Sequence, residues 1–406
     1  MKKKLLSLLT FSLAFAMLSG CWSSREINEL AFVMGVAIDV GEDENDFEIT
    51  LQIANPGAKN GSGEGSAGEG ESSTVFVNFS ETGPGIEMPI SAISLQCDRK
   101  LYTGHNQVIV ISRAAAERGI SPIIDFFTRS TDGRLTVSLF IAEGAAKDVL
   151  SVSGILEPLP SMYLKSLEAS QLSFGERSEA SMMSFVSAML SPTAAAIVPI
   201  VHIFEDESGM RKLSLSGAAA FYDGRLCMTL SPDMLKSVLS IKDKSVENFF
   251  RLHTPDGAAT LNISTSSVAL SAQFFEDGTL DKISVNLRYG CTIAETNISS
   301  DVLSQKTRAS LAQAASEYIS AQAQDTFEYT QFFGADVYGF GEYLYRNHPK
   351  KAKSLLESWR AAYPELNVEF NVSVEILSSG SITQPLAPGG YPQNQPSLQR
   401  KQVSEK

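Results

Sequence analysis

Apolar and polar residues alternate along two early segments of the chain, Ala31–Val40 and Asp46–Ala54. The acidic turn Gly41–Asn45 separates them, so the pattern predicts a β-hairpin. Similar β-rich runs predict further strands at Thr74–Phe79, Gln107–Ile111, Leu135–Ala142, Val198–Phe204, Leu215–Tyr222, Arg225–Leu230, Ala259–Ile263, Val268–Phe275, Lys282–Tyr289 and Asn367–Leu377.

Other segments carry the apolar spacing of helices. A break is expected at Gly119–Pro122 inside one of them, because glycine and proline interrupt a helix. Since helices and strands are intermixed and no fixed-period repeat occurs, we expect a mixed α/β (α+β) fold in which helices flank β-sheets. The helices are predicted at Ile86–Gln96, Ala114–Thr128, Ala145–Leu150, Ser181–Leu190, Asp301–Gln324, Val337–Tyr345 and Lys350–Ala362, with one more after Pro158–Pro160 that contains Met162, Leu164 and Leu167.

Composition divides the chain into regions. The acidic, glycine-containing stretch Glu205–Met210 is interpreted as a boundary between an N-terminal region, 21–204, and a C-terminal domain, 211–378. The N-terminal region is predicted to form two subdomains, 22–144 and 145–204, which makes three domains in all. The Gly/Ser/Glu-rich segment 57–73 is expected to be a flexible loop, and the Pro-, Gly- and Gln-rich segment 379–406 a disordered tail.

The first twenty residues have the pattern of a secretory signal peptide. Lys2–Lys4 form a basic start, and Leu5–Leu18 form an uncharged apolar run that is too short to cross a bilayer. The run ends in Leu18-Ser19-Gly20-Cys21, which resembles the lipobox of bacterial lipoproteins. We therefore expect cleavage after residue 20, a lipid anchor on Cys21, no transmembrane helix in the mature chain, and a location on the extracytoplasmic face of a membrane.

Charge and cysteine content narrow the possible partners. The formal net charge is −13 and becomes −16 when the three lysines of the signal peptide are removed, which argues against binding to nucleic acid. Cys97, Cys227 and Cys291 have no close-spaced partner, so a dense disulfide framework and a cysteine-rich zinc site are excluded. Isolated thiols are favoured, and one disulfide among the three stays open.

No pattern of catalytic residues stands out. The four histidines are scattered, and neither a G-x-S-x-G nor an H-E-x-x-H motif occurs. Gly63-x-Gly65-x-x-Gly68 matches the dinucleotide fingerprint only formally, because it lies in an acidic low-complexity segment. We therefore predict no enzymatic activity, no metal and no cofactor. The aromatic run Phe327–Tyr345 is interpreted mainly as helix core, with a partner-binding face as the alternative.

Four motifs in order along the chain resemble the Ger(x)C lipoproteins, the C subunits of the germinant receptors of endospore-forming bacteria. They comprise Cys21-Trp22 with Arg25–Ala31, then Arg99–His105 followed by Asp125–Arg129 and Arg134, then Gly217–Phe221, and finally Gly334–Gly341 continuing through Trp359 and Tyr363-Pro364. Cys227–Thr229 and Ser231–Met234 depart from the pattern expected for the family.

The resemblance implies a non-enzymatic, lipid-anchored subunit of a complex with A- and B-type integral membrane subunits. Such a subunit would lie on the outer surface of the inner spore membrane and be needed for nutrient-triggered germination through protein contacts. In the family the nutrient pocket is generally placed in the transporter-like membrane subunit, so we expect this chain not to bind the nutrient itself. The alternative is a solute-binding lipoprotein of a transporter, which would share the anchor and the size.

Several signature residues are candidates for structural or interface roles. Arg129 and Arg134 flank a helix-to-strand turn, where a guanidinium is expected to cap carbonyls or hold a carboxylate rather than contact a partner. His105 is expected to bond the turn backbone ahead of a strand, and Asp336 to brace the following helix. Arg25, Arg99 and Trp359 are candidates as members of the same motifs.

Overall fold

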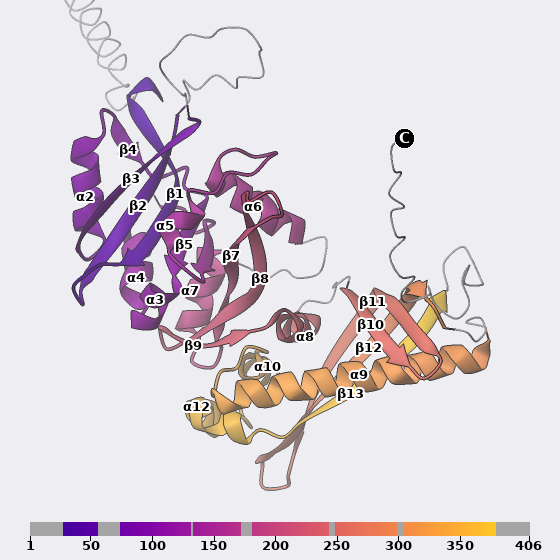
Figure 1. Cartoon of the computed structure of the whole chain (residues 1–406). Helices are drawn as coiled ribbons and strands as arrows, with labels where there is room; N and C mark the ends of the chain where they lie inside the picture. Colours follow the sequence, from indigo (N-terminus) through magenta and orange to yellow (C-terminus); the bar gives the residue numbers. More distant parts are fainter. Residues whose placement is uncertain are drawn as a thin grey trace, which may run out of the picture.

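The computed structural model describes residues 27–55, 74–130, 133–171, 181–242, 248–298 and 304–378. Its described part contains two β-sheets with helices around them, the mixed α/β fold expected from the sequence (Figure 1). The expected signal peptide, Cys21, Arg25, the segment 57–73 and the tail 379–406 lie outside the described residues. None of the described helices has both the length and the apolar character needed to cross a bilayer.

The larger sheet has nine strands in the order β3-β2-β1-β5-β6-β7-β8-β9, with β4 paired to β1. The predicted hairpin is confirmed, since β1 and β2 pair antiparallel along almost their whole length. The central pairs β1–β5, β5–β6 and β6–β7 are parallel. The strands are β1 (Leu30–Val40), β2 (Asp46–Ala54), β3 (Phe76–Pro84), β4 (Lys100–Tyr102), β5 (Val108–Ser112), β6 (Ser138–Ala142), β7 (Ala196–Glu205), β8 (Arg211–Tyr222) and β9 (Arg225–Leu230).

Helices cover both faces of this sheet. Every residue of β5 and β6 is buried, which is the pattern of strands with helices on either side. One face packs on α2 (Glu87–Gln96), α3 (Arg113–Arg118), α4 (Ser121–Arg129) and α7 (Met182–Leu190). The other face packs on α5 (Ala146–Val149) and α6 (Pro160–Gln171). The predicted break at Gly119–Pro122 is confirmed between α3 and α4, where Gly119 has a φ of 133°.

The large sheet continues past residue 210, where the sequence predicted a domain boundary. β8 pairs with β7 antiparallel, so residues 206–210 form a hairpin turn. The carboxylate of Asp206 accepts hydrogen bonds from the N–H groups of Ser208 and Met210 in that turn. The expected boundary between residues 144 and 145 also falls within this sheet, because β7 pairs with β6. An acidic glycine-containing stretch is typical of hairpin turns as well as of linkers, and the division into domains stays a prediction.

The smaller sheet has the order β10-β11-β12-β13. The long helix α9 (Gln305–Phe332), orange in Figure 1, packs against it, and Ser304 caps this helix by accepting from the Thr307 N–H. The two strands predicted between residues 259 and 275 are one continuous strand. The strands are β10 (Asn248–Thr254), β11 (Gly257–Phe274), β12 (Leu280–Thr296) and β13 (Val368–Ser378).

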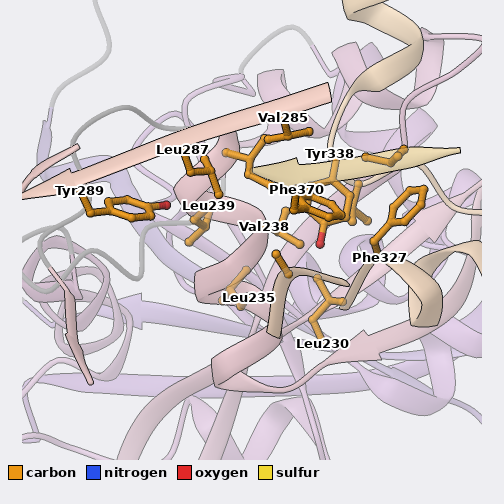
Figure 2. Close-up of a cluster of buried hydrophobic side chains, with 14 of the residues drawn as sticks. Leu230, Leu235, Val238, Leu239, Val285, Leu287, Tyr289, Phe327, Tyr338 and Phe370 are labelled. Carbon is orange, nitrogen blue, oxygen red and sulfur yellow. The ribbon is translucent and has the colours of Figure 1, made fainter. Parts of the chain in front are cut away.

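Four further helices lie in the described residues of the second half of the chain. The sequence pattern missed α8 (Pro232–Lys242), and the single helix expected at Lys350–Ala362 is instead two short helices, α11 (Lys353–Glu357) and α12 (Trp359–Ala362). α10 (Phe340–Asn347) follows α9 after a tight turn. Figure 2 shows how Leu235, Val238 and Leu239 of α8 join Phe327, Tyr338 and Phe370 in one core. Below, the first unit means the nine-stranded sheet with α2–α7, and the second unit means the four-stranded sheet with α8–α12.

Candidate functional site

Asp336 lies at the junction between the two units. It is the buried acidic residue of the fourth motif, and its side chain accepts three hydrogen bonds. Its side-chain Oδ1 accepts hydrogen bonds from the N–H groups of Gly339 at 2.8 Å and Phe340 at 3.1 Å, and its Oδ2 accepts from Gly341 at 2.8 Å. A carboxylate at the start of a helix satisfies N–H groups that have no partner within the helix. Asp336 therefore braces the first turn of α10, the role that the sequence suggested for it.

The Asp336 carboxyl is almost completely buried, with 1% of its surface exposed. Burial raises its pKa to about 6, while the three backbone N–H groups and the charge of Lys242 act in the opposite direction. Burial, together with the nearby Asp336 charge, also raises the pKa of Tyr338 and Tyr363. The buried Asp336 carboxyl thus interacts electrostatically with Lys242 of α8 and with the phenol groups of Tyr338 and Tyr363.

The main chain of Asp336 contacts the first unit directly. Its carbonyl accepts a hydrogen bond from the Ala195 N–H at 3.0 Å, and Ala194 forms an isolated parallel bridge with it. Ala195 immediately precedes β7. On the following turn, a Cβ placed on Gly341 would lie only 2.4 Å from the Cβ of Thr193, so glycine is required for this close approach.

The third motif, Gly217–Phe221, lies in β8 and contacts both units. Ala218 and Ala220 belong to the core of the second unit, whereas Ala219 and Phe221 belong to the core beneath α7. Gly217 has a φ of 72°, and a Cβ there would come within 2.4 Å of the Leu230 carbonyl oxygen. The small residues are therefore explained by packing on both faces of one strand and by a close backbone contact.

A groove of about 1140 Å³ opens beside this junction. The first unit contributes α7 and the segment that leads into β7, and the second unit contributes α8, α10 and α11. Lys242 and the ion pair of Arg346 with Glu342 supply its charges. The remaining lining is mixed and includes Met183, Ser187, Pro192, Leu239, Tyr345 and Leu356. Among the described residues, no group of three His, Cys, Asp or Glu side chains is arranged to hold a metal.

The second motif begins with Arg99–His105, which contains β4, and β4 pairs with the start of β1. The His105 ring packs against Phe32 and Tyr102, with ring centroids 5.2 and 5.5 Å apart. The hydrogen bond to the turn comes instead from Gln107, whose Nε2 donates to the His105 carbonyl at 2.8 Å. Arg99 is exposed in the turn before β4. His105 thus contributes aromatic packing in place of the expected imidazole bond to the turn backbone.

The two arginines around the α4-to-β6 turn behave differently. Arg129 forms an ion pair with Asp125, one turn earlier on α4, with Nε and Oδ2 2.7 Å apart. Both side chains are largely exposed, so the pair contributes little to stability. Arg134 is also exposed, and its carbonyl accepts from the Val137 N–H. Neither arginine points into a buried site.

The aromatic run Phe327–Tyr345 divides between core and surface. Phe327 is buried, and its ring centroid lies within about 6 Å of those of Tyr338, Phe340, Tyr363 and Phe370. Phe332 is 84% exposed and Tyr345 66% exposed. Trp359 is buried close to Tyr363. The interpretation as core therefore holds for Phe327, and a partner-binding face stays a prediction for the exposed side chains. Cys97, Cys227 and Cys291 are free thiols in the structure.

A solved structure shares this fold. The crystal structure of the GerBC protein matches 87% of this chain and all of its own length, with a TM-score of 0.51 and 15% sequence identity. At that identity the match defines the fold class, a mixed α/β protein with two sheets.

Sequence comparison then defines the family. Residues 23–203 match the model of the spore germination protein N-terminal domain, and residues 216–380 match the model described as spore germination B3/GerAC like, C-terminal. The chain therefore belongs to the Ger(x)C family of spore germination proteins.

Relatives from Bacillus subtilis (strain 168) extend over nearly the whole chain. The putative spore germination protein YfkR is 23% identical, and the match covers 94% of this chain and 98% of YfkR. Spore germination protein KC is also 23% identical, with 95% and 98% covered. The resemblance inferred from the four motifs is thus confirmed.

Proposed function

We propose that this chain is the lipid-anchored C-type subunit of a nutrient germinant receptor and acts without chemistry of its own, through contacts with A- and B-type integral membrane subunits. The observation that carries the proposal is family membership in both halves of the chain, 23–203 and 216–380. The lipobox-like Leu18–Cys21 supports the anchor, with the folded body outside the cytoplasm at the outer surface of the inner spore membrane.

The placement of the signature residues supports an assembly role over catalysis. The Asp336 carboxylate binds backbone N–H groups, and Gly217 allows a close approach to the Leu230 carbonyl. The buried side chains of Ala218, Ala220 and Trp359 pack in the hydrophobic core. These positions stabilise the fold, and they do not converge with a nucleophile and a base in the described groove. The exposed Phe332 and Tyr345 are the aromatic side chains best suited to contact a partner.

The two sheets do not support the alternative of a solute-binding lipoprotein. Such a protein should have two similar α/β lobes with a ligand cleft between them. Here one sheet has nine strands with helices on both faces, while the other has four strands built around a long hairpin.

Deletion of this chain tests the proposal. Spores that lack it should lose the response to one set of nutrients and still germinate on a trigger that bypasses nutrient receptors. An affinity tag on the chain should recover the integral membrane subunits from detergent-solubilised spore membranes. A tagged unrelated lipoprotein controls for co-purification through the membrane. Normal germination on every nutrient in a strain without related receptors, with no recovered membrane subunit, would overturn it.

A further inference from the structure

We propose that Asp336–Gly341 is a latch that fixes the second unit on the first, and that its release widens the groove between them. This conformational device goes beyond membership in a receptor complex. The latch consists of the Asp336 carbonyl, the Asp336 carboxylate and Gly341, whose lack of a side chain allows α10 to approach Thr193.

The first element is a direct main-chain connection. The Ala195 N–H donates to the Asp336 carbonyl, and the next residue, Ala196, begins β7. β7 pairs with both β6 and β8 in the middle of the large sheet. Displacement of Asp336 would therefore break a hydrogen bond to a segment that leads directly into a paired strand, and that segment also lines the groove.

The second element is the Asp336 side chain, which positions α10. The carboxylate accepts hydrogen bonds from the N–H groups of three successive residues, Gly339, Phe340 and Gly341. α10 then carries Glu342, Tyr345 and Arg346 into the opposite wall of the groove. One residue thus contacts both walls, the first through its carbonyl and the second through its carboxylate. Lys242 of α8, Tyr222 of β8, Tyr338 and Tyr363 are the titratable groups that interact with it.

The third element is the close approach of α10 to the first unit. A Cβ on Gly341 would meet the Cβ, Cγ2 and Oγ1 of Thr193 at 2.4 to 2.8 Å. Inside an isolated helix, replacing glycine by alanine normally favours the helix. At Gly341 the same change forces the two walls apart, because the Cβ of Thr193 is fixed to its own backbone and cannot rotate away. The contact therefore offers a way to open the latch without removing any hydrogen-bonding group.

The test compares four variants of the full chain by amide hydrogen exchange. In Gly341→Ala, exchange should accelerate at least tenfold at Ala195 and at Gly339–Gly341, while the strands β5 and β12 keep wild-type protection. Small-angle X-ray scattering should show a larger radius of gyration. The double variant Thr193→Gly/Gly341→Ala should restore both readouts, because the obstructing side chain is gone. Thr193→Gly alone is the reference for the double variant, and Gly144→Ala, where an added Cβ meets nothing within 4 Å, should match the wild type.

Three results would overturn the latch. In the first, exchange at Gly341 rises in Gly341→Ala while Ala195 keeps its protection. That result would show that the start of α10 is not coupled to the first unit. In the second, protection is lost equally in β5 and β12, so that the residue serves global folding and not a junction. In the third, the double variant stays as open as Gly341→Ala. If Gly341→Ala does not fold, Asp336→Asn supplies the same comparison, and unchanged exchange at Ala195 and at the start of α10 in that variant would contradict the proposal.

Discussion

Asp336 and Ala195 join the two units of this protein through a main-chain hydrogen bond of 3.0 Å. The same aspartate uses its carboxylate to start α10, so a single buried residue combines a helix cap with a contact between units. A residue with both tasks explains why the fourth motif contains an acid flanked by glycines. Gly334 and Gly339 have φ angles of 64° and 79°, which the tight turns on either side require.

Replacing Asp336 with alanine should destabilise the protein by about 2 kcal/mol or more, because three N–H groups at the start of α10 lose their acceptor in a buried site. Urea unfolding at pH 7 measures the loss. Asp98→Ala is the matched control, since this carboxylate is exposed in the turn before β4. Equal stability of the two variants would show that the cap is not needed.

The stability of the protein should depend on pH through Asp336. Burial raises the pKa of its carboxyl from 3.8 to about 6, so the folded state binds a proton more tightly than the unfolded chain. This contribution is fully present below about pH 4 and is lost as the pH rises through about 6, which amounts to about 3 kcal/mol. The free energy of unfolding of the wild type, relative to that of Asp336→Asn, should therefore fall between pH 4 and pH 6. Parallel pH profiles for the two proteins would contradict the assignment.

Two phenylalanines of the aromatic run should give opposite results. Phe327→Ala removes a buried ring surrounded by four others and should cost about 3–5 kcal/mol of unfolding free energy. Phe332→Ala changes a side chain that is 84% exposed and should leave stability within about 0.5 kcal/mol. If the exposed face binds a partner, Phe332→Ala should still reduce recovery of the membrane subunits in the pull-down. Full recovery would remove Phe332 from the contact surface.

If Cys21 carries the proposed lipid anchor, replacing it with alanine should release a folded protein from the membrane fraction and abolish its support of germination, since a lipid holds a protein beside membrane partners. Fractionation and germination assays measure the two effects. Cys97→Ala is the matched control, because this free thiol lies in the folded body and its loss should leave the protein membrane-bound. Full function of Cys21→Ala would show that the anchor is dispensable.

The Asp336 brace could be anticipated locally. An acidic residue placed before a glycine-containing turn and a helical pattern indicates an N-terminal cap, because the cap and its N–H donors are neighbours in sequence. Its second contact could not be anticipated. Ala195 lies far away along the chain and offers only a backbone N–H, which leaves no trace in the residue type. His105 shows the same limit, since its ring packs on Phe32 from a distant strand.

The sequence by itself determined most of the elements, including the β1–β2 hairpin and the break between α3 and α4, because these depend on the spacing of apolar residues and on local turn chemistry. It also determined the family, through four short motifs. Only the tertiary structure decided that β8 and β9 extend the first sheet, and that Ala218 and Ala220 face the second unit. Alternation along a strand specifies which side chains share a face. It does not specify the neighbouring strand, which depends on contacts between residues far apart in the chain.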